Sequence, residues 1–203
     1  SNIIHWDNST SEWVVNGSYS VKIGNDAGLN SSSPDSVAIG HTAGYGNQGT
    51  NAIAIGYEAG YTNQNAASIA IGSNSGRHDQ GHISVAIGFE AGYTNQNAGT
   101  IAIGYLSGNQ NQKTGAVAIG FGAGRENQNE YAVAVGTHAG YNNQGNDAIA
   151  IGLGAGFLSQ GSNAIAIGYQ AGYTSQGTRA IAIGYLSGDR NQGQNSVAIG
   201  GFA

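Results

Sequence analysis

A five-residue strand motif that recurs at a fixed interval constrains the fold of this chain more than any other feature. One copy is Ala52-Ile53-Ala54-Ile55-Gly56, and the last is Ser196-Val197-Ala198-Ile199-Gly200. The motif's closing glycines are 16 residues apart throughout (40 − 24 = 16, 200 − 184 = 16), at Gly24, Gly40, Gly56, Gly72, Gly88, Gly104, Gly120, Gly136, Gly152, Gly168, Gly184 and Gly200. A period kept over twelve copies is typical of a solenoid, in which each repeat packs only on its neighbours.

The strand alternates between two kinds of residue. With each closing glycine as position 0, positions −3 and −1 are always Ile or Val, and position −2 is Ala in every copy except Lys22. We expect the Ile and Val side chains inside the coil, where each would contribute roughly 1.5–3 kcal/mol by burial. The alanine face would then pack against neighbouring chains of a homotrimer. This predicted interface comprises Ala38, Ala54, Ala70, Ala86, Ala102, Ala118, Ala134, Ala150, Ala166, Ala182 and Ala198.

The second half of each coil carries a weaker pattern. Position +3 is Ala or Ser, position +4 is Gly, and position +8 is Gln in every coil from Gln48 to Gln192, with Ser32 as the exception. The glycines indicate positive φ or a close approach of the next coil. Repeated amides at the coil spacing predict hydrogen-bonded ladders along the stack, a structural role.

The chain divides into two parts. Residues 20–203 form the repeat domain, whereas residues 1–19 lie outside the period and contain Trp6 and Trp13. Asn16-Gly17 is a favoured hairpin turn, so we expect a short strand or hairpin that caps the first coil. An equally open alternative is that this segment is the remnant of a preceding domain in a longer fibre.

Composition argues against several classes of function. Only 8% of the residues are charged and the net charge is −5, with no cluster among Lys22, Arg77, Lys113, Arg125, Arg179 and Arg190. This argues against nucleic acid or an anionic membrane as partner. No apolar run reaches the roughly 18 residues of a membrane span. Cysteine is absent, which is compatible with an extracellular location.

Signatures of catalysis and of metal binding are missing. The sequence has no nucleophile elbow, phosphate-binding loop, zinc spacing or calcium nonapeptide, so we expect no catalytic residues, cofactor or metal. Glu58 and Glu90 share position +2 two coils apart, a spacing at the upper edge of that in inverting glycosidases. His78 and His82 share a coil with Asp79, but we expect them to be solvated turn residues.

The repeat resembles a known family. Ser84-Val85-Ala86-Ile87-Gly88 followed by Ala91 is similar to the head repeats of YadA-type trimeric autotransporter adhesins. The resemblance covers residues 20–200 and implies an all-β, left-handed parallel β-roll assembled as a homotrimer. The fixed period and the Ala-Gly-Tyr-Thr-Asn-Gln second half are more similar to the C-terminal repeats of chlorella virus cell-wall attachment proteins.

These features predict an extracellular attachment fibre, on a virion or alternatively on a bacterial cell, that binds a host cell-wall polysaccharide. The alternatives are a purely structural stalk and, third, a polysaccharide-cleaving enzyme. Weak sugar contacts repeated along the fibre would gain by avidity. The candidate glycan-binding residues are Tyr45, Tyr61, Asn63, Tyr93, Asn95, Tyr141, Asn143 and Tyr173. The opposing interpretation is that these tyrosines fill the groove between chains.

Overall fold

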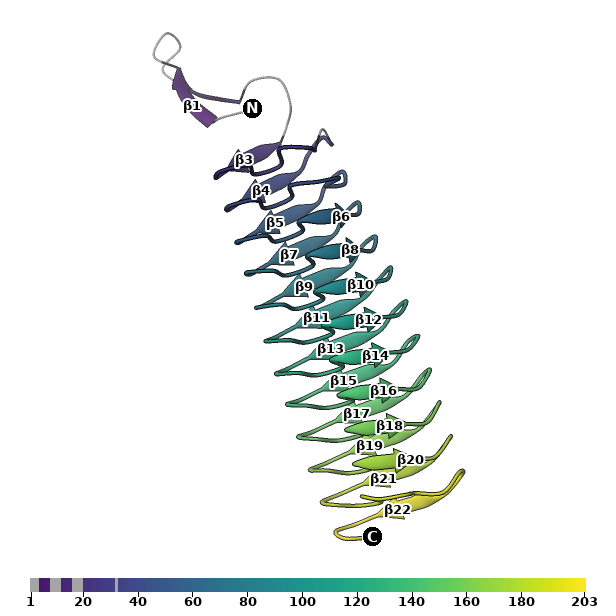
Figure 1. The fold of residues 1–203 in the computed structure, drawn as a ribbon. Helices are drawn as coiled ribbons and strands as arrows, with labels where there is room; N and C mark the ends of the chain where they lie inside the picture. The colour runs from purple at the N-terminus through teal and green to yellow at the C-terminus, as the bar shows by residue number, and fades with distance from the viewer. Residues whose placement is uncertain (1–3, 8–11, 16–19, 32) are drawn as a thin grey trace.

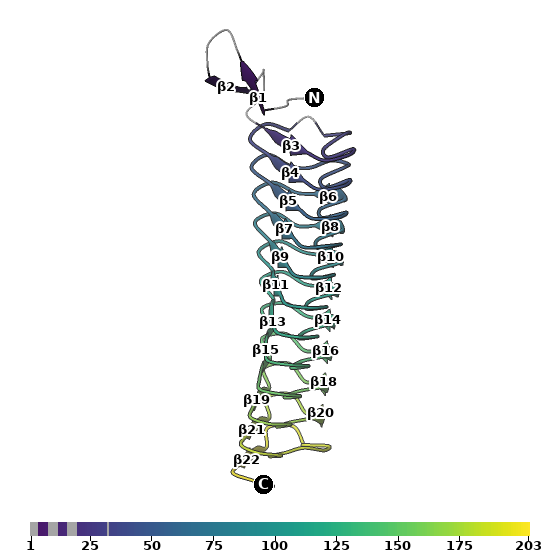
Figure 2. The ribbon, with the colours of Figure 1, turned by 90° about the vertical axis from the view of Figure 1, so that its left-hand side faces the viewer.

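The chain forms an all-β parallel solenoid of about 11 turns, as the sequence predicted (Figure 1). The computed structural model describes residues 4–7, 12–15, 20–31 and 33–203. Each coil contributes one strand to a 12-stranded sheet, and most coils contribute a second strand to an 8-stranded sheet. The strands of the two sheets lie in two separate columns (Figure 2).

The 12-stranded sheet is built from the repeated motif. Its strands pair in parallel and in register, so that equivalent residues of neighbouring coils lie opposite each other, as Val117 does with Val133. In sequence order the strands are β3 (Val21–Ile23), β4 (Val37–Ile39), β5 (Ile53–Ile55), β7 (Ile69–Ile71), β9 (Val85–Ile87), β11 (Ile101–Ile103), β13 (Val117–Ile119), β15 (Val133–Val135), β17 (Ile149–Ile151), β19 (Ile165–Ile167), β21 (Ile181–Ile183) and β22 (Val197–Ile199).

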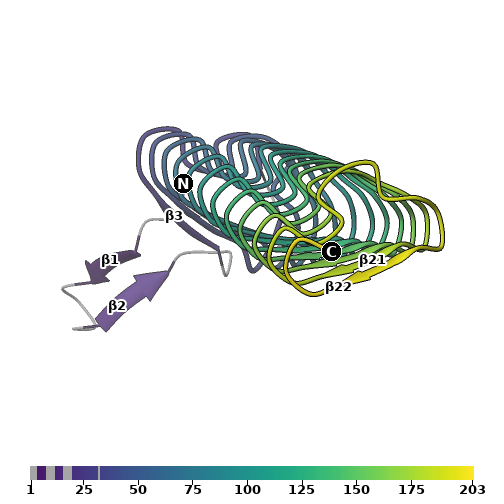
Figure 3. The same cartoon turned by 90° about the horizontal axis from the view of Figure 1, so that it is seen from below.

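The 8-stranded sheet comes from positions +6 to +8. Its strands are β6 (Thr62–Gln64), β8 (His78–Gln80), β10 (Thr94–Gln96), β12 (Gln110–Gln112), β14 (Glu126–Gln128), β16 (Asn142–Gln144), β18 (Leu158–Gln160) and β20 (Thr174–Gln176). Viewed along its axis, the coil is flat along the 12-stranded sheet and indented on the opposite side (Figure 3). The two halves of a coil therefore present differently shaped outer faces.

The prediction that Ile and Val lie inside the coil is wrong. Ala38, Ala54, Ala70, Ala86, Ala102, Ala118, Ala134, Ala150, Ala166 and Ala182 are all 0% exposed within the single chain, and Ala198 on the last strand is half-buried. These alanines pack on the Ala or Ser at +3 of the opposite wall, and the Ile and Val side chains point outward. The alanines therefore offer no surface to another chain.

The coil is too thin for larger side chains. A Cβ placed on Gly140 would lie 3.1 Å from the Ala134 Cβ on the facing wall. The closing glycines are equally constrained, since a Cβ on Gly120, whose φ is +129°, would lie 2.7 Å from the Gly136 carbonyl oxygen. Alanine and glycine fit this spacing, whereas an inward Ile would require wider coils.

Glutamine at +8 fills the remaining interior. Gln128 is 0% exposed, and its Nε2 donates to the carbonyl oxygens of Val117 and Ala132 and to Gln144 Oε1. The amide-to-amide bonds run without a break from Gln96 through Gln112 and Gln128 to Gln144. The predicted amide ladder is thus confirmed from Gln96 to Gln144 and between Gln176 and Gln192. It lies in the interior, and elsewhere the +8 amides bond to backbone carbonyl groups without reaching the next glutamine, as Gln64 does.

Outside the period, β1 (Ile4–Asp7) and β2 (Glu12–Val15) form an antiparallel hairpin, with Trp6 opposite Trp13 in register. Asn16-Gly17, which we expected to form a hairpin turn, lies outside the described residues. The division at residue 20 and the capping role of the hairpin remain predictions. No helix in the described part of the chain is long and apolar enough to cross a membrane.

Candidate functional site

The outer face of the 12-stranded sheet is a continuous apolar stripe. It consists of the Ile and Val side chains at −3 and −1, which lie one above another on successive strands. Many are substantially exposed in the single chain, with values of 38% for Ile119, 39% for Ile151 and 36% for Ile183. Apolar patches of more than a few hundred Å² are rare on monomeric soluble proteins and mark association surfaces. This apolar stripe is the strongest interface candidate on the described surface.

Aromatic side chains border the apolar stripe at position +1. Phe89, Tyr105 and Phe121 stack on one another, with ring centroids 5.3 and 4.9 Å apart. A second stack joins Tyr169 and Tyr185 at 5.0 Å. These residues follow the closing glycines and are exposed, so they extend the apolar stripe around one corner of the coil.

The candidate tyrosines at +5 also form stacks. The rings of Tyr45 and Tyr61 lie 5.2 Å apart at an interplanar angle of 15°. Phe157 lies between Tyr141 and Tyr173, with a centroid distance of 4.9 Å to each. Because stacked rings cover one another's faces, a sugar has little access to the broad face of these rings. The accessible parts of the +5 column are its ring edges and hydroxyl groups.

A charged group interrupts the +5 column at Arg77. Its guanidinium lies between the rings of Tyr61 and Tyr93, 5.3 and 5.5 Å from their centroids. It donates to the Tyr93 hydroxyl at 2.8 Å and forms an ion pair with Glu58 at 2.6 Å. Tyr61 and Tyr93 are therefore joined through Arg77, and their inner faces are occupied by it.

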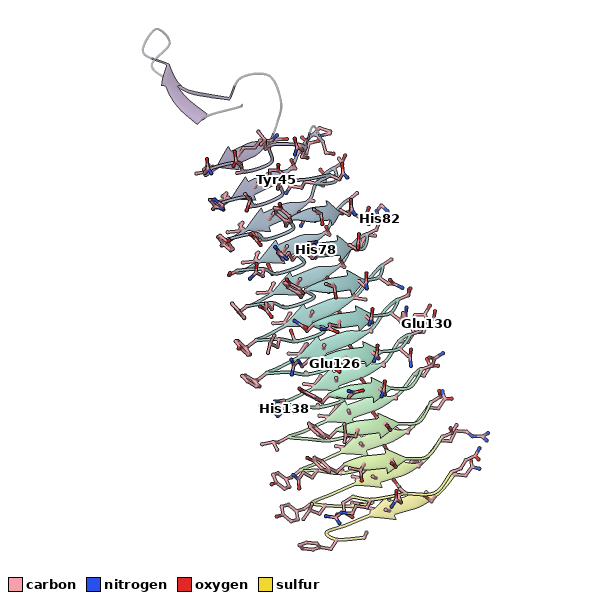
Figure 4. All side chains as sticks on the ribbon, viewed as in Figure 1. Tyr45, His78, His82, Glu126, Glu130 and His138 are labelled. Atoms are coloured by element: carbon pink, nitrogen blue, oxygen red, sulfur yellow. The ribbon has the colours of Figure 1, made fainter. Side chains whose placement is uncertain are left out.

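His78 belongs to the same cluster. Its Nδ1 lies 2.8 Å from Thr62 Oγ1, and its Nε2 lies 2.9 Å from Arg77 Nη1. Burial, and then the positive charge of Arg77, lower the pKa of His78 below its usual value. Figure 4 shows His78 on the face between the two corners of the coil. The expectation of a solvated turn residue is wrong for His78.

The candidate asparagines at +7 form an exposed ladder. Asn63 Nδ2 donates to Asp79 Oδ1 at 2.8 Å, and Asn95 Nδ2 donates to Asn111 Oδ1 at 3.0 Å. Asn143 Oδ1 accepts from Asn127 Nδ2 at 3.2 Å. Position +7 has positive φ, +55° at Asn63, which asparagine tolerates better than most residues. The ladder places side-chain amides on the outer surface in the coils that have Asn at +7, whereas Ser31, Asp79, Ser159 and Ser175 occupy this position in the others.

Glu58 and Glu90, the two carboxylates that share position +2, make contacts with different residues. The Glu58 carboxylate forms an ion pair with Arg77. Glu90 offers its backbone carbonyl oxygen to Asn109 Nδ2 at 2.9 Å. No group of three or more His, Cys, Asp or Glu side chains that could hold a metal ion occurs in the described part of the chain.

Sequence reasoning missed two parts of this surface. It identified the +5 tyrosines but not Arg77 and Phe157, which hold them in stacks, although both occupy +5 in the sequence. It also missed His138, which contacts Phe121 at +1 and Tyr141 at +5 and so links the two aromatic columns. Figure 4 places His138 at the corner where they meet.

Two segments of the chain match the family model of the YadA head domain repeat, residues 48–59 and 159–187. Both segments include the strand-to-turn region with its Gly and the Ala or Ser that follows, the same features that carry the sequence resemblance. No curated protein and no solved structure matches the chain. The repeats are thus similar to those of an adhesin head and fold as a parallel β-solenoid.

Proposed function

We propose that this chain is the repeat region of a trimeric surface attachment fibre, which binds cell-surface polysaccharide through the second half of its coils. One observation carries the proposal. The two outer faces differ in chemistry, with an uninterrupted apolar stripe on one side and a repeated polar surface of asparagine amides and tyrosine edges on the other. The first suits self-association and the second suits a hydroxyl-rich ligand.

The apolar stripe supports the trimer. Exposed Ile and Val on strand after strand gain free energy by leaving water, at about 25 cal/mol per Å² of buried apolar surface. In a three-fold arrangement of parallel protomers in register, the three stripes would face one common axis and bury one another along the length of the fibre. The number three comes from the similarity to YadA head repeats. This interface replaces the buried alanines that we expected from the sequence.

Charge placed in the apolar stripe tests the trimer. We expect Ile103→Glu, Ile119→Glu and Val135→Glu together to convert the trimer to a folded monomer, because each carboxylate would be desolvated in the contact. Sedimentation equilibrium measures the mass. The control places three glutamates on successive coils at +10, with Asn146→Glu, Ser162→Glu and Thr178→Glu, where Glu130 occurs naturally. A parent protein that sediments as a monomer would refute the trimer.

Polysaccharide binding is supported by repetition. The asparagine amides recur over successive coils from Asn95 to Asn143 at the coil spacing of about 4.8 Å, and tyrosine hydroxyls recur at +5 at less regular intervals. A polymer lying along the fibre would therefore meet similar groups several times. Individual contacts of this kind are weak, and their sum along three chains gains by avidity. Because ring faces are covered, recognition would use hydrogen bonds to ring edges, hydroxyls and amides.

Pull-down on intact walls of candidate host cells tests the binding. We expect Asn63→Ser, Asn95→Ser and Asn143→Ser together to reduce retention several-fold while the trimer remains, because Ser159 and Ser175 already occupy +7. A second variant, Tyr45→Leu, Tyr141→Leu and Tyr173→Leu, removes the hydroxyls, with Leu29 as the natural precedent at +5. Undiminished retention of both trimeric variants would remove this surface from consideration.

A structural stalk is the second candidate. The observation that favours it is the coverage of the ring faces, since stacked tyrosines stabilise neighbouring coils whether or not a ligand binds. A parent trimer that is not retained by any candidate wall would support the stalk. In either case the similarity to an adhesin head repeat supports a location at an outer surface, and a virion and a bacterial cell are the two locations that we propose.

A further inference from the structure

An open hollow of about 330 Å³ lies at one corner of the coils. We call it the corner hollow, and its polar lining comprises Asn63, Asn65, Asp79, His82, Gln96, Asn97 and Thr114. These residues come from four successive coils, so the hollow extends over roughly 14 Å along the axis at about 4.8 Å per coil. Figure 4 places His82 at the corner opposite His138. The corner hollow is therefore separate from the apolar stripe and from the aromatic columns.

The coil at the centre of the hollow departs from the repeat. Asp79 is the only acidic residue at +7, where the other coils have Asn or Ser. His82 is the only histidine at +10. Since other coils fold with Asn or Ser at +7 and with residues such as Thr, Ala or Ser at +10, folding requires neither Asp79 nor His82, and the two side chains line one hollow.

Ile83, which follows His82, is a third departure. It has a φ of +56° and its side chain is 72% exposed. A β-branched residue is strained in this conformation, and most other coils have Asn, Asp or Gly at position +11. The strain is not offset by burial, so the stability of the coil does not explain Ile83, which follows the lining residue His82 in sequence.

A glycine forms part of the hollow's wall. A Cβ on Gly81 would lie 2.4 Å from the backbone carbon of Asn97 and 2.6 Å from the Ala98 nitrogen. No side chain can therefore occupy this part of the wall without shifting the next coil. Small residues here and larger polar residues around them produce a recess with polar edges.

The lining chemistry selects a class of ligand. Amide, hydroxyl and imidazole groups both donate and accept hydrogen bonds, which suits the hydroxyls of a sugar. Asp79 is the only carboxylate in the lining and there is no Lys or Arg. Its Oδ1 accepts from Asn63 Nδ2, which leaves its second oxygen available. A single negative charge favours a neutral or amine-bearing ligand and disfavours an anionic one.

We propose that the corner hollow is a discrete subsite for a short stretch of neutral or amine-bearing polysaccharide, held chiefly by Asp79 and His82. This inference rests on the proposed function and makes it more specific. The repeated surface would give every coil the same weak affinity, whereas the corner hollow gives one stronger site in each chain. Binding of a soluble oligosaccharide would then saturate at one site per protomer.

Titration of the intact protein with four hexasaccharides tests the subsite. The probes are oligomers of glucose, N-acetylglucosamine, glucosamine and galacturonic acid, and the readouts are calorimetry and chemical-shift changes at residues 79, 82 and 114. We expect at least one of the first three to bind with one site per protomer, and the anionic oligomer not to bind.

The variant Asp79→Asn with His82→Thr provides the critical comparison. Asn at +7 and Thr at +10 occur in other coils, so the variant should fold as the parent does. We expect binding of the oligosaccharide to weaken by about tenfold or more, equivalent to about 1.4 kcal/mol for the lost hydrogen bonds. The matched control, Ser159→Asn with Ser162→Thr, places the same two residue types at the same two positions of a coil outside the hollow, and should leave binding unchanged.

Three outcomes would overturn the subsite. They are the absence of binding by any of the neutral or amine-bearing probes, equal affinity of the Asp79→Asn, His82→Thr variant, and preferential binding of the anionic oligomer. If the parent is still retained by host walls in any of these cases, the proposed function stands without the subsite. A parent that is not retained by walls would instead contradict the proposed function itself.

Discussion

The two halves of a coil differ in how much their sequence varies from coil to coil. In the strand half, from −4 to 0, every position repeats almost without change, and its inner alanines and closing glycine each face a backbone or side chain within van der Waals distance. In the second half, positions +5, +6 and +10 vary between aromatic, charged and small residues. Residue identity is therefore nearly constant at positions that pack in the interior between coils, and it varies at positions on the outer surface.

The largest expected effect comes from the closing glycine. Gly120→Ala should destabilise the protein by about 1–3 kcal/mol from backbone strain alone, with a further cost because the new Cβ would collide with the Gly136 carbonyl oxygen. Gly99→Ala in the second half has positive φ but no atom within 4 Å, so only the conformational cost of about 1–2 kcal/mol applies. Urea unfolding measures both, and equal losses would contradict the close approach of the coils.

Replacing one residue on each face of the strand by a larger one distinguishes the buried face from the outer face. Ala134→Leu should cost about 1–3 kcal/mol by overpacking, because its Cβ already faces Gly140 across the interior. The neighbouring change Val133→Leu lies on the apolar stripe and should cost less. Thermal melts of both variants give the order, and a more harmful Val133→Leu would place Val133 in the interior after all.

The buried and the exposed amide ladders should respond differently to the same kind of change. Gln128→Ser removes four hydrogen bonds inside the coil and should cost about 1–3 kcal/mol, because the carbonyl groups of Val117 and Ala132 and the amides of Gln112 and Gln144 lose a buried partner. Asn127→Ser acts on the exposed ladder, where water replaces the lost bond, and should cost less than about 1 kcal/mol. Similar losses in chemical denaturation would show that burial does not distinguish the two ladders.

The smallest expected effect is a pH dependence at His78. Its pKa is lowered in the folded state, so below the ordinary histidine pKa the unfolded chain takes up a proton more readily than the folded one. The free energy of unfolding should therefore decline as the pH falls from about 7 to 5. His78→Thr, with Thr62 and Thr94 as precedents at +6, should flatten part of that slope. An unchanged slope would show that His78 titrates normally.

Much of the fold followed from the sequence, because the period fixes the register of every coil. The parallel pairing, the twelve-strand sheet and the glutamine ladder were predicted from Gly, Gln and the strand motif. The face of the strand that points into the coil could not be predicted from the alternation of residues. Alternation separates two faces but does not say which one is buried. The usual preference for burying Ile and Val over Ala failed because the two walls of the coil are too close at position −2 for an Ile or Val side chain, as the approach of Gly140 to the Ala134 Cβ shows.

The candidate site was harder to predict from the sequence than the fold. The tyrosines at +5 were found by their repetition, but their ring faces are covered by residues one coil away, such as Phe157 and Arg77. Such coverage depends on side-chain directions that composition does not encode. The corner hollow involves Asp79 and His82, which are exceptions to the repeat, and the sequence alone gave no reason to place them on one surface.

The in-register pairing of coils has a consequence for how the length of such a fibre can vary. The same pattern of backbone hydrogen bonds joins each coil to the next. The Gly136 N–H donates to the Ile119 carbonyl oxygen, and the Gly152 N–H donates to that of Val135. Removing residues 137–152 as a unit would join Gly136 to Leu153 and leave an unbroken pattern on either side. Duplication or loss of a coil by unequal recombination would then change the reach of the fibre in steps of about 4.8 Å without redesigning any contact.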